Sequence, residues 1–151
     1  MGNRYSAPRA RVAESLEEPR PGAVKLALVL IALFVLVACY QQIMDFSDVN
    51  NGEMSGLAWL VDWLWVVAIA VTGFLIAKSR RWARWVLLFF ALRELYHLGD
   101  AMLFLSMFED GDAREFFGTR SLVMLPLASL FSVGATILVF GPGRGWFEPR
   151  G

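Results

Sequence analysis

The chain has 151 residues, of which 57% are hydrophobic, and it carries equal numbers of basic and acidic residues, 14 of each. A mean hydropathy of +0.52 is too high for an ordinary soluble domain, and a net charge of zero gives no support for nucleic-acid binding. Cys39 is the single cysteine, which excludes an internal disulfide and any zinc or redox motif that needs a cysteine pair. Together these properties indicate a membrane protein with one domain.

Four apolar segments have the length of a membrane span. They cover residues 26–44, 57–77, 85–108 and 121–140. A helix rises about 1.5 Å per residue and needs about 20 residues to cross a hydrocarbon core of about 30 Å. Because the segments lack the alternation of barrel strands, we predict an all-α fold, an integral membrane four-helix bundle that occupies residues 26–140.

Turn and capping residues mark the ends of the predicted helices. The sequence Asn-Asn-Gly at 50–52 favours a tight turn before the second span. Ser79 is expected to cap the third span, so that the second and third spans form a helical hairpin. A capping-box pattern opens the segment 112–118, where we expect a short interfacial helix on the outer side that ends at Gly118.

The distribution of basic residues predicts the orientation. The segments 1–25, 78–84 and 141–151 contain most of the Lys and Arg residues, whereas the connections 45–56 and 109–120 are acidic. By the positive-inside rule, both termini then lie in the cytoplasm. We therefore expect a multi-pass protein of the inner or plasma membrane, in contact with the lipid bilayer. Its first 25 residues, rich in Pro, Arg and Glu, should form a flexible cytoplasmic tail, and residues 141–151 a second one.

The segment from Leu36 to Cys39 resembles the bacterial lipobox, at which a signal peptide is removed and a lipid is attached to the cysteine. The sequence before it is long and contains Glu14, Glu17 and Glu18, unlike the compact basic region of a signal peptide. We therefore expect the first span to be retained, and lipidation of Cys39 stays the alternative.

The third span contains a group of ionisable residues: Arg93, Glu94, His97 and Asp100. Charges at membrane depth are costly, so they are normally paired or used for function. At about 100° per residue, Arg93, His97 and Asp100 share one stripe of a helix. Glu94 lies at the edge of that stripe. Asp62 in the second span lies at a similar depth to Asp100, so we expect both carboxylates to share an outward-facing polar pocket.

Three kinds of role are open for these residues. Arg93 can neutralise Glu94 or Asp100, and His97 can pair with Asp62, which would fix the helix register without any reaction. Alternatively, Asp, Glu and His form proton relays in membranes, and histidine titrates near neutral pH, which favours proton or ligand binding. Glu94 and His97 have the Glu-x-x-His spacing of di-iron sites and are the only plausible metal ligands, but the chain has no second histidine.

No complete catalytic constellation is present in the sequence, which lacks a Walker loop, a nucleophile elbow and a dinucleotide-binding fingerprint. We therefore favour a small non-enzymatic membrane protein, acting as an accessory or assembly subunit of a membrane complex or within a homo-oligomer. A proton-coupled transporter or channel for a small substrate is the alternative. An intramembrane redox or metal-binding enzyme is the third possibility, and no cofactor can be named for it.

Overall fold

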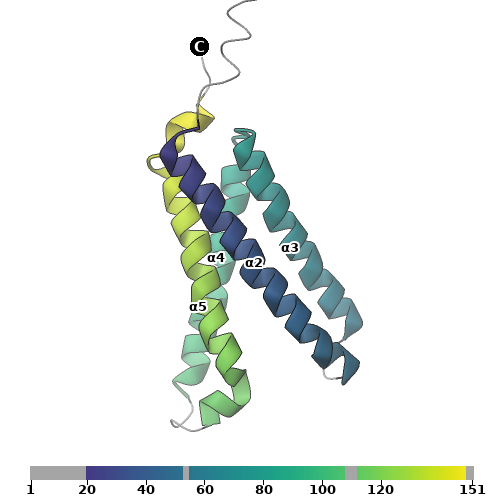
Figure 1. Cartoon of the computed structure of the whole chain (residues 1–151). Coiled ribbons are helices and arrows are strands. Elements are labelled where there is room, and N and C mark those ends of the chain that lie inside the picture. Colours follow the sequence, from purple (N-terminus) through teal and green to yellow (C-terminus); the bar gives the residue numbers. More distant parts are fainter. Residues whose placement is uncertain (1–19, 53–54, 108–111, 149–151) are drawn as a thin grey trace, which may run out of the picture.

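The structure is a computed structural model that describes residues 20–52, 55–107 and 112–148, with only the backbone of Asp48 and of residues 112–122. Every regular element within these ranges is helical, as the sequence predicts. Four α-helices are followed by a short 3-10 helix (Figure 1): α2 (Gly22–Asn50), α3 (Gly56–Ala77), α4 (Ala83–Leu105), α5 (Asp112–Phe140) and η1 (Arg144–Phe147).

Three of the described α-helices are long and apolar enough to cross a membrane. The apolar stretches are Gly22–Ser47 in α2, Gly56–Ala77 in α3 and Val123–Phe140 in α5. The remaining helix, α4, has 23 residues and thus the length of a span. Its apolar sequence is interrupted by Arg93, Glu94 and Asp100. Whether α4 can lie in a membrane therefore depends on how these charged side chains are paired.

Two of the predicted boundaries are wrong. Residues 112–118 do not form a separate interfacial helix, because α5 is continuous from Asp112 to Phe140. A glycine inside a helix costs only about 1 kcal/mol relative to alanine, so Gly118 does not end a helix that continues on both sides of it. Ser79 does not cap α4 either, since Trp82 occupies the capping position and makes no side-chain hydrogen bond there.

Ser79 instead lies in the turn that ends α3. Its backbone N–H donates to the carbonyl of Ile76 at 3.0 Å, and the N–H of Arg80 donates to the carbonyl of Leu75 at 3.0 Å. These bonds satisfy the last carbonyls of the helix and require a left-handed residue, which is Ser79 with φ 55°. The chain therefore reverses within a few residues and continues as α4.

The start of α2, the α3–α4 turn and η1 lie together at one end of the bundle (Figure 1). Each α-helix packs against the next one in the chain, and α2 also packs against α5. In η1, the indole Nε1 of Trp146 donates to the carbonyl of Ile76 at 3.3 Å, and Phe147 is buried in the hydrophobic core. The segment after α5 is therefore packed structure and not only a tail.

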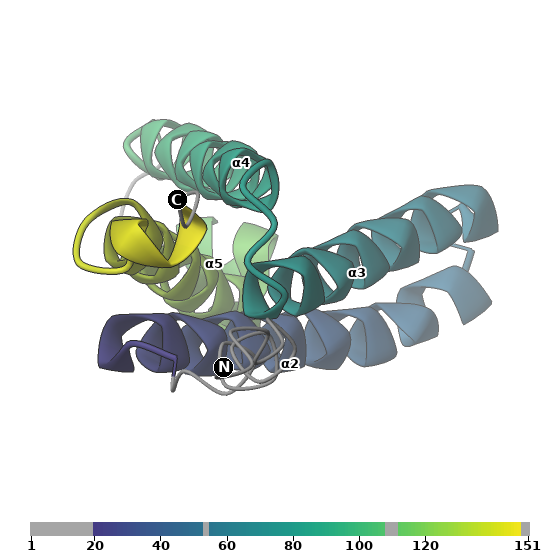
Figure 2. The same ribbon diagram turned by 90° about the horizontal axis from the view of Figure 1, so that it is seen from above.

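The best-packed part of the core lies at this end, and the helices separate toward the other. Val24, Ile76 and Val139 are fully buried. Gly73 brings α3 close to α2, since a Cβ added there would lie 2.9 Å from Cγ2 of Ile31. Farther along, α2 and α3 diverge from α4 and α5, as two perpendicular views show (Figures 1 and 2). The divergence positions the candidate site.

Candidate functional site

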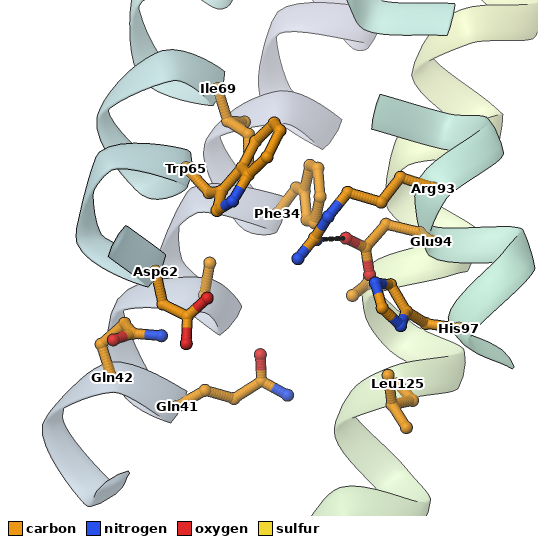
Figure 3. Close-up of a pocket in the computed structure, with 12 residues that line it drawn as sticks. Phe34, Gln41, Gln42, Asp62, Trp65, Ile69, Arg93, Glu94, His97 and Leu125 are labelled. Atoms are coloured by element: carbon orange, nitrogen blue, oxygen red, sulfur yellow. Dashed lines mark hydrogen bonds and ion pairs between the residues drawn. The ribbon is translucent and has the colours of Figure 1, made fainter. Parts of the chain in front are cut away.

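A pocket of about 220 Å³ lies between the four α-helices. Six polar and six apolar residues line it (Figure 3). The polar residues are Gln41 and Gln42 from α2, Asp62 from α3, and Arg93, Glu94 and His97 from α4; the apolar ones are Phe34, Ala38, Trp65, Ile69, Leu125 and Ala128. Side chains from all four helices therefore meet at one place.

Arg93 and Glu94 form an ion pair at the α4 wall of the pocket. Nη1 of Arg93 lies 2.9 Å from Oε1 of Glu94, and the Glu94 side chain is only 9% exposed. The guanidinium also lies over the ring of Trp65, with 4.9 Å between Cζ and the ring centroid, well within the range of about 6 Å for a cation–π contact. Trp65 is thus a site residue that the sequence analysis missed.

A hydrogen bond between α4 and α5 holds the backbone at Glu94. The hydroxyl of Ser129 in α5 donates to the backbone carbonyl of Glu94 at 3.2 Å, and the hydroxyl of Ser132 donates to the carbonyl of Ser129 at 3.1 Å. Both serines are buried, and neither lines the pocket. The bond of Ser129 therefore holds α4 against α5, whereas the bond of Ser132 lies within α5.

Asp62 enters the pocket from the opposite wall. Its carboxylate and the amide of Gln41 point into the space that Arg93 faces from the other side (Figure 3). Within the described part of the chain, Arg93 pairs with Glu94 and no ion pair involves Asp62. Next to Asp62, Gln42 is 8% exposed, and its Oε1 is buried without a hydrogen-bond partner. This wall therefore presents the Asp62 carboxylate, which forms no ion pair with a described residue, and the amide of Gln41 (Figure 3).

His97 and Asp100 lie differently from the expectation. Both are exposed, but only His97 lines the pocket. Asp100 lies nearly one turn farther along α4, toward the end where α3 has diverged from α4 (Figure 1). The structure therefore does not bring Asp62 and Asp100 into one pocket, although it does bring Asp62 together with the α4 residues before Asp100. His97 makes no ion pair with Asp62.

Glu94 and His97, one turn apart on α4, are the candidate metal ligands. Across the ranges that the structure describes, no group of three or more His, Cys, Asp or Glu residues is close enough to hold a metal ion. Cys39 is a free, half-buried cysteine in α2 and does not line the pocket.

The described residues form an all-helical fold, and three of these helices are long and apolar enough to cross a membrane. Comparison of the chain with protein-family models, with curated proteins and with solved structures finds no match. The pocket and the exposed face of α4 are the two features of the molecule that bear on its function.

Proposed function

We propose that the protein crosses the membrane four times and has both termini in the cytoplasm. The candidate spans α3 and α5 are joined by α4, which leaves one end of the bundle and reaches the other (Figure 1). A helix that connects two spans in this way has to cross the same thickness. At about 1.5 Å per residue, the 23 residues of α4 extend for about 35 Å, which exceeds a hydrocarbon core of about 30 Å.

Cysteine labelling tests this topology. Single cysteines at Asn51, in the α2–α3 turn, and at Ser79, in the α3–α4 turn, are introduced into a Cys39→Ser background. An impermeant maleimide is expected to label Asn51→Cys on intact cells, and Ser79→Cys only after the membrane is permeabilised, because basic residues surround Ser79 and favour the cytoplasm. Labelling of Ser79→Cys but not of Asn51→Cys on intact cells would overturn the proposed orientation. Equal labelling of both positions on intact cells would show that α3 does not cross the membrane.

Within this topology we favour a non-enzymatic accessory or assembly subunit of a membrane complex, or a member of a homo-oligomer. The observation that carries this function is the exposure of His97 and Asp100 on α4. Asp100 lies five residues before the end of α4. If α4 crosses the membrane, exposure of this carboxylate to lipid is costly. Polar side chains in membranes commonly form hydrogen bonds across helices, so a helix from another subunit or a second copy would remove this cost.

Photo-crosslinking in native membranes tests the proposed contact. Tyr96 is 70% exposed and lies one turn from Asp100 on the same face of α4. A photo-reactive residue at Tyr96 is expected to crosslink to a protein chain, and mass spectrometry of the adduct identifies a second copy or a different subunit. Leu130 on α5 is 65% exposed and serves as the matched control, for which only lipid adducts are expected. A monomer in mild detergent with no protein adduct at Tyr96 would contradict the accessory role.

Proton-coupled transport of a small substrate is the alternative, and the pocket favours it. Asp62, Glu94 and His97 line one pocket, and these residue types form proton relays in membranes. The same purified sample separates the two functions. An isolated homo-oligomer that drives proton-coupled uptake into liposomes would support transport, whereas co-purifying subunits without uptake would support the accessory role.

A further inference from the structure

We propose that the pocket binds a small organic cation that combines a primary ammonium group with a short apolar body. The proposal stands independently of the accessory and transport functions, because it rests on the charges and the shape of the pocket alone. Asp62, Arg93 and Glu94 all line the pocket. Of the two carboxylates, that of Glu94 forms an ion pair with Arg93.

Among the described residues, the carboxylate of Asp62 lines the pocket without an ion pair. Arg93 already pairs with Glu94 at 2.9 Å, and its guanidinium reaches from α4 to the ring of Trp65 on α3 (Figure 3). Glu94 is nearly inaccessible, whereas Asp62 is half-buried and reaches the open space. An unpaired carboxylate in an apolar surrounding is costly, so a cation that enters beside Asp62 lowers the free energy of the site.

The groups around Asp62 favour a cation with N–H donors. Gln41 points into the pocket beside the carboxylate (Figure 3), and Gln42 Oε1 is buried without a partner. Rotation about the last side-chain bond of Gln42 exchanges its oxygen and nitrogen, so this oxygen can face the same space. A primary ammonium has three N–H donors and no acceptor, and its hydrogen bonds to a carboxylate are charge-assisted. A quaternary ammonium leaves these acceptors unsatisfied.

The other half of the pocket selects an apolar body. Phe34, Ile69 and Leu125 come from three different helices and line the space beside the charged groups. Burial of a short hydrocarbon chain against them is favourable, at roughly 25 cal/mol for each Å² of apolar surface removed from water. A cavity of about 220 Å³ admits a molecule of a few carbon atoms, so we choose n-hexylammonium as the probe.

The test uses the full chain in mild detergent or lipid nanodiscs. Titration with n-hexylammonium chloride is expected to raise the midpoint of thermal unfolding, because a ligand that binds only the folded state stabilises it. The neutral alcohol n-hexanol should not do so, and n-hexyltrimethylammonium should bind more weakly. The affinity for n-hexylammonium, measured by calorimetry, is expected to fall at least about tenfold in Asp62→Asn, which loses a charge-assisted hydrogen bond.

Asp100→Asn is the matched control, since it makes the same chemical change on a carboxylate outside the pocket. The affinity of this variant for n-hexylammonium should stay within about twofold of that of the wild-type protein. The proposal would be overturned if n-hexanol bound as tightly as n-hexylammonium, or if Asp62→Asn and Asp100→Asn lost equal affinity for n-hexylammonium. Equally tight binding of n-hexyltrimethylammonium would show that the ammonium group is not held by hydrogen bonds. Should Asp62→Asn fail to fold, Gln42→Leu provides the second variant, in which unchanged affinity would also contradict the site. None of these results alters the crosslinking experiment at Tyr96.

Discussion

Replacement of Arg93 by leucine is expected to lower the free energy of unfolding by about 3–5 kcal/mol, the usual cost of removing one partner of a buried ion pair. The Glu94 side chain is 9% exposed and pairs with Arg93 at 2.9 Å. The substitution leaves this carboxylate without a cation, and it also removes the guanidinium from the ring of Trp65. Chemical or thermal unfolding of the purified protein, together with the yield of monodisperse material, measures the effect.

Double substitutions identify the carboxylate that pairs with Arg93. Arg93→Leu combined with Glu94→Leu should recover most of the lost stability, because an apolar replacement of a whole buried pair is often neutral or stabilising. Arg93→Leu combined with Asp100→Leu should not, since Asp100 lies outside the pocket and Arg93 does not pair with it. The sequence alone allows either carboxylate as the partner. Unchanged stability of Arg93→Leu, or recovery by Asp100→Leu, would show that the Arg93–Glu94 pair does not support the fold.

The helices could be predicted because apolar length is a direct physical requirement for a membrane span. The second predicted span, 57–77, agrees within one residue with Gly56–Ala77. The first, 26–44, is shorter than Gly22–Asn50, because hydropathy marks the apolar part of a helix and the backbone stays helical beyond it. The turn predicted at 50–52 is confirmed by Gly52, which has the positive φ of 76° that suits glycine.

The site could be predicted only in part. Helical periodicity places Arg93 and His97 on one face of α4, and both line the pocket with Asp62. Periodicity contains no information on where neighbouring helices separate, and for this reason the expectation for Asp100 failed. It also does not determine the rotation of α3, whose residues are apolar on most sides, so the contact of Arg93 with Trp65 was missed. The position of Trp65 three residues after Asp62, on the same helix face, was the available signal.

The segment after α5 shows a different limit. The sequence Gly-Pro-Gly at 141–143 correctly predicts the end of the helix, but the residues behind it resemble a polar tail. Trp146 and Phe147 are the exception, and apolar residues that follow a helix end often pack back against its last turns. Phe147 is 2% exposed and belongs to the hydrophobic core. Its burial can be tested directly.

Phe147→Ala is expected to lower the free energy of unfolding by about 3–5 kcal/mol, the range for removing a fully buried phenylalanine side chain. Phe74→Ala removes the same atoms from a position on α3 that is 62% exposed, and its effect should stay within about 0.5 kcal/mol. Unfolding of both variants under identical conditions gives the comparison.

Proteolysis locates the effect of Phe147→Ala in the molecule. Loss of the buried ring should free η1 from the bundle end, where Trp146 also donates to the carbonyl of Ile76. Arg144 lies at the start of η1, and trypsin cleaves after arginine. In inside-out vesicles, trypsin is expected to cleave after Arg144 faster in Phe147→Ala than in Phe74→Ala. The rate of cleavage follows the population of the locally opened state. Equal stability and equal cleavage in the two variants would mean that Phe147 does not anchor η1 to the bundle.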